Sequence, residues 1–155
     1  MKIEEEIQQD IFKSEYQKAG INILFTANSM NLKSFQILKR FGLTLPQFNI
    51  LRILRGQHPQ STTINSLINR MLDKASNASR IVEKLKDKKL VVRTINKFDR
   101  RSVDVKITET GLNLLAQIDL VDDEFYFGTD TLSQVEVIML NHLLDKGRKS
   151  IKHNP

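Results

Sequence analysis

The 155-residue sequence contains no cysteine and no long hydrophobic run. Without cysteine the chain forms no disulfide, binds no metal through thiolates and senses no oxidant through a thiol of its own. Lys, Arg, Asp or Asn interrupts every apolar stretch, so neither a signal peptide nor a transmembrane helix is predicted. These absences favour a cytoplasmic protein.

Motifs of the common enzyme classes are missing too. HExxH, GxSxG and a glycine-rich phosphate loop are all absent. The three histidines, His58, His142 and His153, fall in a predicted loop, a helix and the C-terminal tail. Only Glu136 and Asp145 near His142 leave a metal-sensing role open, and we expect this histidine to be structural or solvated. The sequence therefore predicts no enzyme, no cofactor and no metal site.

Positive charge is concentrated in the middle of a chain whose composition, 40% apolar and 27% charged, is that of one globular domain. The whole chain has a net charge of +6, whereas residues 74–106 hold eleven basic and four acidic side chains, or +7. Charge confined in this way is typical of a surface that binds a polyanion, above all nucleic acid. A membrane surface is less favoured, because the basic helix lacks a broad face of large apolar side chains.

Apolar side chains at helical spacing predict helices on both sides of this basic segment. The expected helices are a stripe at 3–11, then about 19–40, 46–55, 63–72, 76–88, 108–121 and 131–147. Their expected N-caps are Thr44, Thr62 or Thr63, Ser76, Thr108 and Thr131. Gly42, Gly56 and Gly147 are the expected stops.

Residues 90–108 alternate as two short strands around a charged loop that contains Lys97, Asp99, Arg100 and Arg101. A two-stranded hairpin is marginal in water, so it has to pack on helices. Asp99 and Arg101 are two residues apart and can share one side, where the carboxylate would orient the guanidinium; Arg100 projects differently and is the expected groove probe. A narrow A·T-rich minor groove attracts either arginine.

The helix before this hairpin has the composition of a major-groove reader. Ala78, Ile81, Val82 and Leu85 share its apolar face, and short polar and basic side chains lie elsewhere on it. Ser and Asn can meet base edges at close range, and Arg can bind guanine with two hydrogen bonds. An alternative is that the first two polar residues only cap the helix. The candidate DNA-binding residues are Ser76, Asn77, Ser79, Arg80, Lys84, Lys97, Arg100 and Arg101, with Asp99 orienting the loop.

Together these patterns predict a mainly α fold with a small β-hairpin, a winged helix-turn-helix. We expect a single domain over 1–155, with the winged helix-turn-helix at about 44–108 and dimerisation helices at about 1–41 and 109–152. The terminal helices have more apolar surface than one reading head needs, which favours a homodimer. Two-fold symmetry would set the recognition helices about 34 Å apart, one turn of double-stranded DNA. The acids Asp119, Asp122, Asp123, Glu124 and Asp130 would lie away from the duplex.

Several of these segments, in this order and spacing, resemble the MarR family of bacterial transcription regulators. They are LTLPQF at 43–48, the helix pair with Ser79, Arg80 and Leu85, LVVR at 90–93, DRRS at 99–102, ITETG at 107–111 and LSQVE at 132–136. The resemblance implies a homodimer that binds pseudo-palindromic operators, with helix 76–88 in the major groove and the wing arginines in the minor groove. It also implies frequent release by a small anionic or phenolic effector. No membrane partner is expected, because the basic helix lacks a broad apolar face.

Two departures from the family concern the backbone and the regulation. Lys89 stands where relatives usually have a glycine, and a left-handed backbone there would cost on the order of 1 kcal/mol. Either Lys89 gains a phosphate contact in exchange or the turn is built differently. The lack of cysteine excludes the peroxide sensing of some relatives.

Phe25, Met30, Phe48 and Tyr126 could line an effector pocket, but their spacing favours core positions.

Two rival functions fit the same fold. One is a winged helix that binds DNA without sequence preference, as an architectural factor, and the other is a winged-helix module that binds a protein. Phosphate contacts alone give salt-sensitive binding that barely distinguishes sequences, so a specificity ratio separates these alternatives from a regulator. The sequence does not indicate the operator, the regulated genes or whether binding represses or activates.

Overall fold

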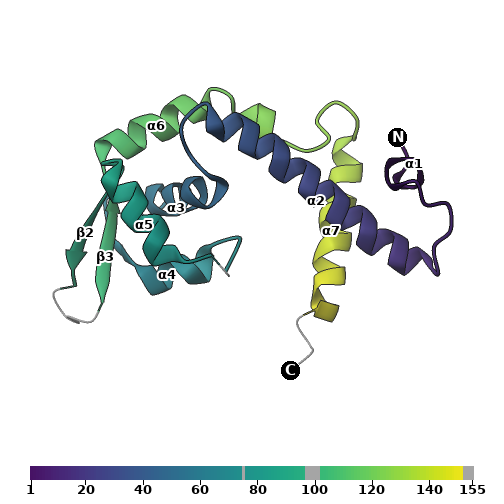
Figure 1. Cartoon of the computed structure of the whole chain (residues 1–155), viewed down its shortest axis with the longest axis horizontal. Coiled ribbons are helices and arrows are strands. Elements are labelled where there is room, and N and C mark those ends of the chain that lie inside the picture. Colours follow the sequence, from purple (N-terminus) through teal and green to yellow (C-terminus); the bar gives the residue numbers. More distant parts are fainter. Residues whose placement is uncertain (75, 97–101, 152–155) are drawn as a thin grey trace. The chain divides into compact units, whose positions relative to one another are not determined.

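The computed structural model describes residues 1–74, 76–96 and 102–151 and is mainly helical with one small sheet, which confirms the predicted fold class (Figure 1). Its helices are α1 (Ile3–Ile7), α2 (Glu15–Lys39), α3 (Leu45–Arg55), α4 (Ile64–Arg70), α5 (Ala78–Asp87), α6 (Glu109–Asp119), the 3-10 helix η1 (Asp122–Phe125) and α7 (Gln134–Ile151). Its strands are β1 (Thr62–Thr63), β2 (Val91–Ile95) and β3 (Val103–Ile107). The chain divides into two compact units, Met1–Glu124 and Phe125–Pro155.

The predicted hairpin is confirmed as the antiparallel pair β2 and β3. In its register Val91 faces Ile107 and Ile95 faces Val103. A third strand, β1, pairs with the other edge of β3, so β3 lies in the centre of the sheet. Strand β1 was not predicted, because two residues are too few to display the alternation of a strand.

The core of the first unit lies between α3, α4, α5, α6 and the sheet. Its largest fully buried side chains are Leu38, Ile50, Leu51, Leu54, Leu67, Leu85, Leu115, Ile118, Val82, Val91 and Val105. Helix α6 approaches the strands closely at Gly111, where a Cβ would lie 2.4 Å from the Leu90 carbonyl oxygen and 2.7 Å from Ile107. The side chain of any other residue would push α6 off the sheet, so this contact requires glycine.

Three predicted N-caps are confirmed. The hydroxyl groups of Thr44, Thr63 and Thr108 each accept a hydrogen bond from the backbone N–H three residues later. At Thr44 the side chain of Gln47 returns the bond by accepting from the Thr44 N–H at 3.1 Å, which completes a capping box. The predicted stop of α2 is also present, because Gly42 has a φ of 67°.

Several predicted helix bounds are wrong. Helix α1 ends at Ile7, because Gln8 is left-handed, and Ile11 is 84% exposed instead of packing in the same stripe. Helix α4 ends at Arg70, which leaves Leu72 outside it and 83% exposed.

Both predicted ends of α7 are also wrong, and the helix begins three residues after the expected cap Thr131. The Ser133 N–H donates to the carboxylate of Glu136 at 2.8 Å, and the Ser133 hydroxyl accepts from the Glu136 N–H at 3.4 Å, so this pair forms the start. Gly147 lies inside α7 instead of ending it. A Cβ there would meet no atom within 4 Å, so nothing in the packing requires glycine.

Candidate nucleic-acid interface

The helix-turn-helix consists of α4, a connection and α5. The buried side of α5 is formed by three of the four predicted residues, Ala78, Val82 and Leu85, and the fourth, Ile81, is half-buried. The helix starts later than expected: Asn77 is the N-cap, and its Oδ1 accepts from the Arg80 N–H at 3.0 Å. Ser76 therefore lies outside the helix, where its hydroxyl donates to the carboxylate of Asp73 at 2.5 Å.

The outward side of α5 presents polar and basic side chains. Ser79 and Arg80 are exposed, Lys84 lies one turn farther along, and all three lie away from the buried face. Within the part of the chain that the structure describes, the ion pairs of α5 involve Glu83 and Lys86, and neither Arg80 nor Lys84 takes part in one. Their charges thus remain available to an external anion.

The base of the wing is held by backbone and side-chain hydrogen bonds. The Asn96 N–H donates to the Ser102 carbonyl oxygen at 3.0 Å, one step beyond the last pair of the hairpin. The Asn96 side-chain amide donates to both carboxylate oxygens of Asp104, at 2.9 and 3.1 Å. Asn96 and Ser102 therefore define a fixed base for the five residues between them. The predicted contact residues Lys97, Arg100 and Arg101, and Asp99, lie outside the described residues.

An ion pair that the sequence pattern did not predict joins α5 to the wing. The carboxylate of Glu83 accepts hydrogen bonds from Lys86 at 2.8 Å and from the guanidinium of Arg93 on β2. The bond from Lys86, followed by that from Arg93, lowers the pKa of Glu83 below its ordinary value. Because the folded-state pKa is lowered, this interaction stabilises the fold above the ordinary pKa of 4.5 and is lost as the pH falls below it.

Arginines outside the reading head are paired with the acids after the wing. Arg40 contacts Glu124 at 3.0 Å, and Arg55 contacts Asp119 at 2.6 Å. Arg52 approaches Asp122 at 3.9 Å. These pairs offset positive charge on α3 and at the end of α2, whereas Arg80 and Lys84 of α5 take part in no ion pair within the described residues.

Lys89 adopts a left-handed backbone, with a φ of 59°. The sequence alone left open whether this turn is left-handed or built differently. The turn uses the bonds of a helix end: the Leu90 N–H donates to the Leu85 carbonyl oxygen at 3.0 Å, and the Lys89 N–H donates to that of Lys86 at 2.8 Å. The Thr108 hydroxyl donates to the Lys89 carbonyl oxygen at 2.8 Å. The turn is therefore well satisfied, although its residue is not glycine.

We expect Lys89→Gly to raise the free energy of unfolding by roughly 1 kcal/mol, because glycine carries no Cβ penalty at positive φ. The greater entropy of glycine in the unfolded chain offsets part of this gain. Thermal melts followed by circular dichroism measure the effect. Lys84→Gly, in the interior of α5, is the matched control and should instead lower stability by about 1 kcal/mol. A Lys89→Gly variant that melts below the parent would contradict the expected relief of strain.

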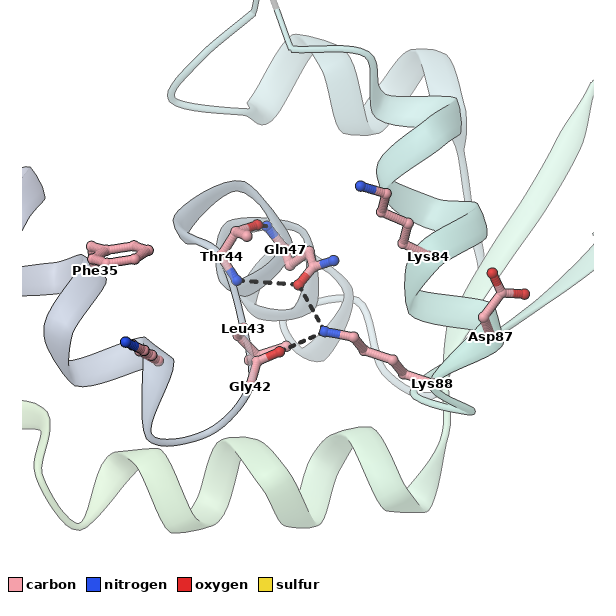
Figure 2. Close-up of a pocket in the computed structure, with 9 residues that line it drawn as sticks. Phe35, Gly42, Leu43, Thr44, Gln47, Lys84, Asp87 and Lys88 are labelled. Atoms are coloured by element: carbon pink, nitrogen blue, oxygen red, sulfur yellow. Dashed lines mark hydrogen bonds between the residues drawn. The ribbon is translucent and has the colours of Figure 1, made fainter.

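A groove of about 530 Å³ lies between the end of α2, the start of α3 and α5. It is lined by Phe35, Lys39, Gly42, Leu43, Thr44, Gln47, Lys84, Asp87 and Lys88. Figure 2 shows the Phe35 ring on one side and the Lys84 side chain on the other. The groove thus combines an aromatic ring with three lysines and one carboxylate.

The other residues that the sequence singled out do not line this groove. Phe48 is in the core, as its spacing favoured, but Met30 and Tyr126 are exposed, so a core position is wrong for both. His142 is exposed. Within residues 1–74, 76–96 and 102–151, no three His, Cys, Asp or Glu side chains gather as a metal site would require. None of the helices over the same residues has the length and apolar character that crossing a bilayer demands.

Comparisons with known proteins identify the family. Residues 41–102, which run from the turn after α2 to the base of the wing, match the model of the MarR family. The chain is 30% identical over 105 residues to the uncharacterized HTH-type transcriptional regulator YpoP of Bacillus subtilis, covering 67% of this chain and 73% of YpoP. It is 26% identical over 113 residues to the HTH-type transcriptional regulator MgrA of Staphylococcus aureus, covering 73% and 75% of the two chains.

A solved structure agrees at the level of the fold. The S. aureus MepR–DNA complex superposes with a TM-score of 0.76 at 23% identity, over 90% of this chain and 99% of MepR. The matched segment contains the helix-turn-helix and β2, and the structural match extends over the flanking helices as well. The chain therefore belongs to the MarR family of winged-helix transcription regulators.

Proposed function

We propose that the protein is a homodimeric repressor that binds a pseudo-palindromic operator, with α5 in the major groove and the wing in the minor groove. The observation that supports this most is the outward side of α5, where Arg80 and Lys84 have no ion-pair partner among the described residues. Arg80 is suited to reading guanine. The shorter side chains of Ser76, Asn77 and Ser79 meet base edges at close range, and Lys84 binds phosphate. In the wing, Lys97, Arg100 and Arg101 contact the minor groove, and Asp99 orients Arg101.

Apolar surface on both long terminal helices supports the dimer. Only Ile37 and Leu38 of the 25 residues of α2 are buried, and none of the 18 residues of α7 is, all of them within the described chain. The exposed apolar side chains of these helices are Tyr16, Ile23, Leu24, Met30, Leu32 and Phe35 on α2 and Val135, Ile138, Met139, Leu143 and Ile151 on α7. Surfaces of this kind are costly in water, and a second copy of the chain would cover both.

The groove beside α5 is the proposed site of a small anionic or phenolic effector. Phe35 offers a ring for stacking, and the ammonium groups of Lys39 and Lys84 offer charge for a carboxylate or phenolate. Because α5 lines this groove, a bound ligand would alter the position of the recognition helix and weaken its fit to the operator.

Selection of the purified protein on a pool of random duplexes tests the proposal. We expect an inverted repeat whose half-sites lie about 10 base pairs apart, bound at least roughly 1000-fold more tightly than random DNA. Footprinting of the DNA upstream of its own coding sequence should protect a similar repeat. Equal affinity for all duplexes would favour the architectural alternative, and no binding at low salt would favour the protein-binding one. Repeating the footprint with benzoate tests the effector, which should release the operator.

A further inference from the structure

The turn between α2 and α3 holds the side chain of a lysine from the end of the recognition helix. Lys88, the C-cap of α5, extends its ammonium group to the carbonyl oxygen of Gly42 at 2.5 Å and to the Oε1 of Gln47 at 3.2 Å. Figure 2 shows both bonds, together with the bond from the Thr44 N–H to the same Oε1. The ammonium thus joins two parts of the chain that are more than forty residues apart.

The acceptors of Lys88 are held in place by bonds of their own. Gln47 is 4% exposed, and its Oε1 belongs to the capping box that starts α3. Gly42 follows the last turn of α2, where the Gly42 N–H donates to the Lys39 carbonyl oxygen at 3.1 Å. The C-terminal end of a helix has partial negative charge, so a cation is favoured there. A hydrogen bond from an ammonium is also stronger than one between neutral groups.

A second polar contact ties α5 to the wing. Glu83 binds Arg93 of β2, so one polar contact ties α5 to the hairpin and the other, through Lys88, ties it to the end of α2. The buried residues Val82 and Leu85 hold α5 on the core between them. Apolar packing has little directional preference, so the hydrogen bonds of Lys88 add a directional contact between the end of α5 and the corner.

We propose that Lys88 is a positioning residue that fixes the recognition helix to the α2–α3 corner and thereby sets the half-site spacing the dimer accepts. This inference rests on the proposed function, in which α2 is a dimerisation helix. In a two-fold dimer the separation of the two α5 helices depends on how each is held to its own α2. Lys88 therefore determines how strictly the dimer rejects operators of the wrong length.

The test measures binding of the full-length protein to three duplexes that contain the selected half-sites at their native spacing, one base pair closer and one base pair farther. We expect the parent to prefer the native spacing clearly. In Lys88→Met, which has an unbranched side chain of similar length but no donor, the preference should fall by roughly three- to tenfold. Lys88→Arg retains the charge and the donors and should restore most of it.

Two further variants separate positioning from charge. Lys84→Met removes a neighbouring positive charge that does not bind the corner, so it should lower affinity and the salt slope with the spacing preference unchanged. Gln47→Met removes an acceptor of Lys88 and no charge, so it should relax the preference with the salt slope unchanged. Thermal melts followed by circular dichroism show whether each variant is folded.

Four outcomes are informative. A Lys88→Met variant with the spacing preference of the parent overturns the inference, as does an equal loss of preference in Lys88→Met and Lys84→Met. If selection yields no preferred duplex at all, the proposed function itself fails and this inference fails with it. A preferred duplex bound with relaxed spacing by Lys88→Met alone of the two lysine variants supports both.

Discussion

Leu143→Glu should convert the protein from a dimer to a monomer. Leu143 lies on the exposed apolar stripe of α7 that also contains Val135, Ile138 and Met139 and is 54% exposed in the single chain, so a charge there is tolerated by the protomer. In the proposed dimer the same charge would be buried without a partner, which is strongly unfavourable. Light scattering coupled to size-exclusion chromatography gives the mass, and operator titration should show a loss of roughly 100-fold or more, because one subunit then binds alone.

Asn141→Glu is the control for this prediction. Asn141 is exposed on the same helix but falls away from the stripe, so its variant should remain dimeric and bind the operator as the parent does. Far-ultraviolet circular dichroism of both variants shows whether the helices persist. A dimeric Leu143→Glu protein with the affinity of the parent would rule out this face of α7 as the subunit interface.

Arg80→Ala should weaken binding to the selected operator by about 1 to 3 kcal/mol and leave binding to random DNA nearly unchanged. The guanidinium is exposed near the start of α5 and has no ion-pair partner within the described residues, so its removal costs the fold little. Arg80 is a better probe than Asn77, because the latter also caps the helix and its loss would lower stability as well. Fluorescence anisotropy on both duplexes at several salt concentrations gives the two affinities.

The wing supplies the comparison for Arg80. Arg100→Ala and Arg101→Ala should weaken binding to both duplexes and lower the salt slope by roughly 0.9 for each phosphate that the variant no longer neutralises. Lys33→Ala, an exposed change on α2, should alter neither affinity. Equal losses on operator and random DNA in all three arginine variants would mean that α5 contributes charge only and would support an architectural role.

Local patterns were the parts of this fold that could be predicted from the sequence. The caps at Thr44, Thr63 and Thr108 involve a side chain and a backbone group three residues apart, so the sequence contains the whole interaction. The same logic explains the error at α7. Ser133 and Glu136 form a capping box that is legible in LSQVE, and it prevails over the lone hydroxyl of Thr131.

Contacts between distant elements could not be predicted in the same way. The Glu83–Arg93 pair depends on how α5 lies against β2, and the bonds of Lys88 depend on where α5 meets the α2–α3 corner. No periodicity encodes such meetings, because they result from the packing of the core. The candidate DNA-binding residues on α5 were accessible to prediction for the opposite reason, since helical spacing alone separates an outward side from an inward one.

The hydrogen bonds at the base of the wing have a consequence for how regulators of this kind diversify. Asn96, Ser102 and Asp104 close the hairpin below the tip, so the strands are held whatever number of residues joins them. Doubling the length of a closed loop costs only about 0.6 kcal/mol. Insertions, deletions and exchanges between residues 97 and 101 can therefore accumulate at little cost to the core. In the proposed complex, the sequence that meets the minor groove can therefore evolve separately from the scaffold that presents it.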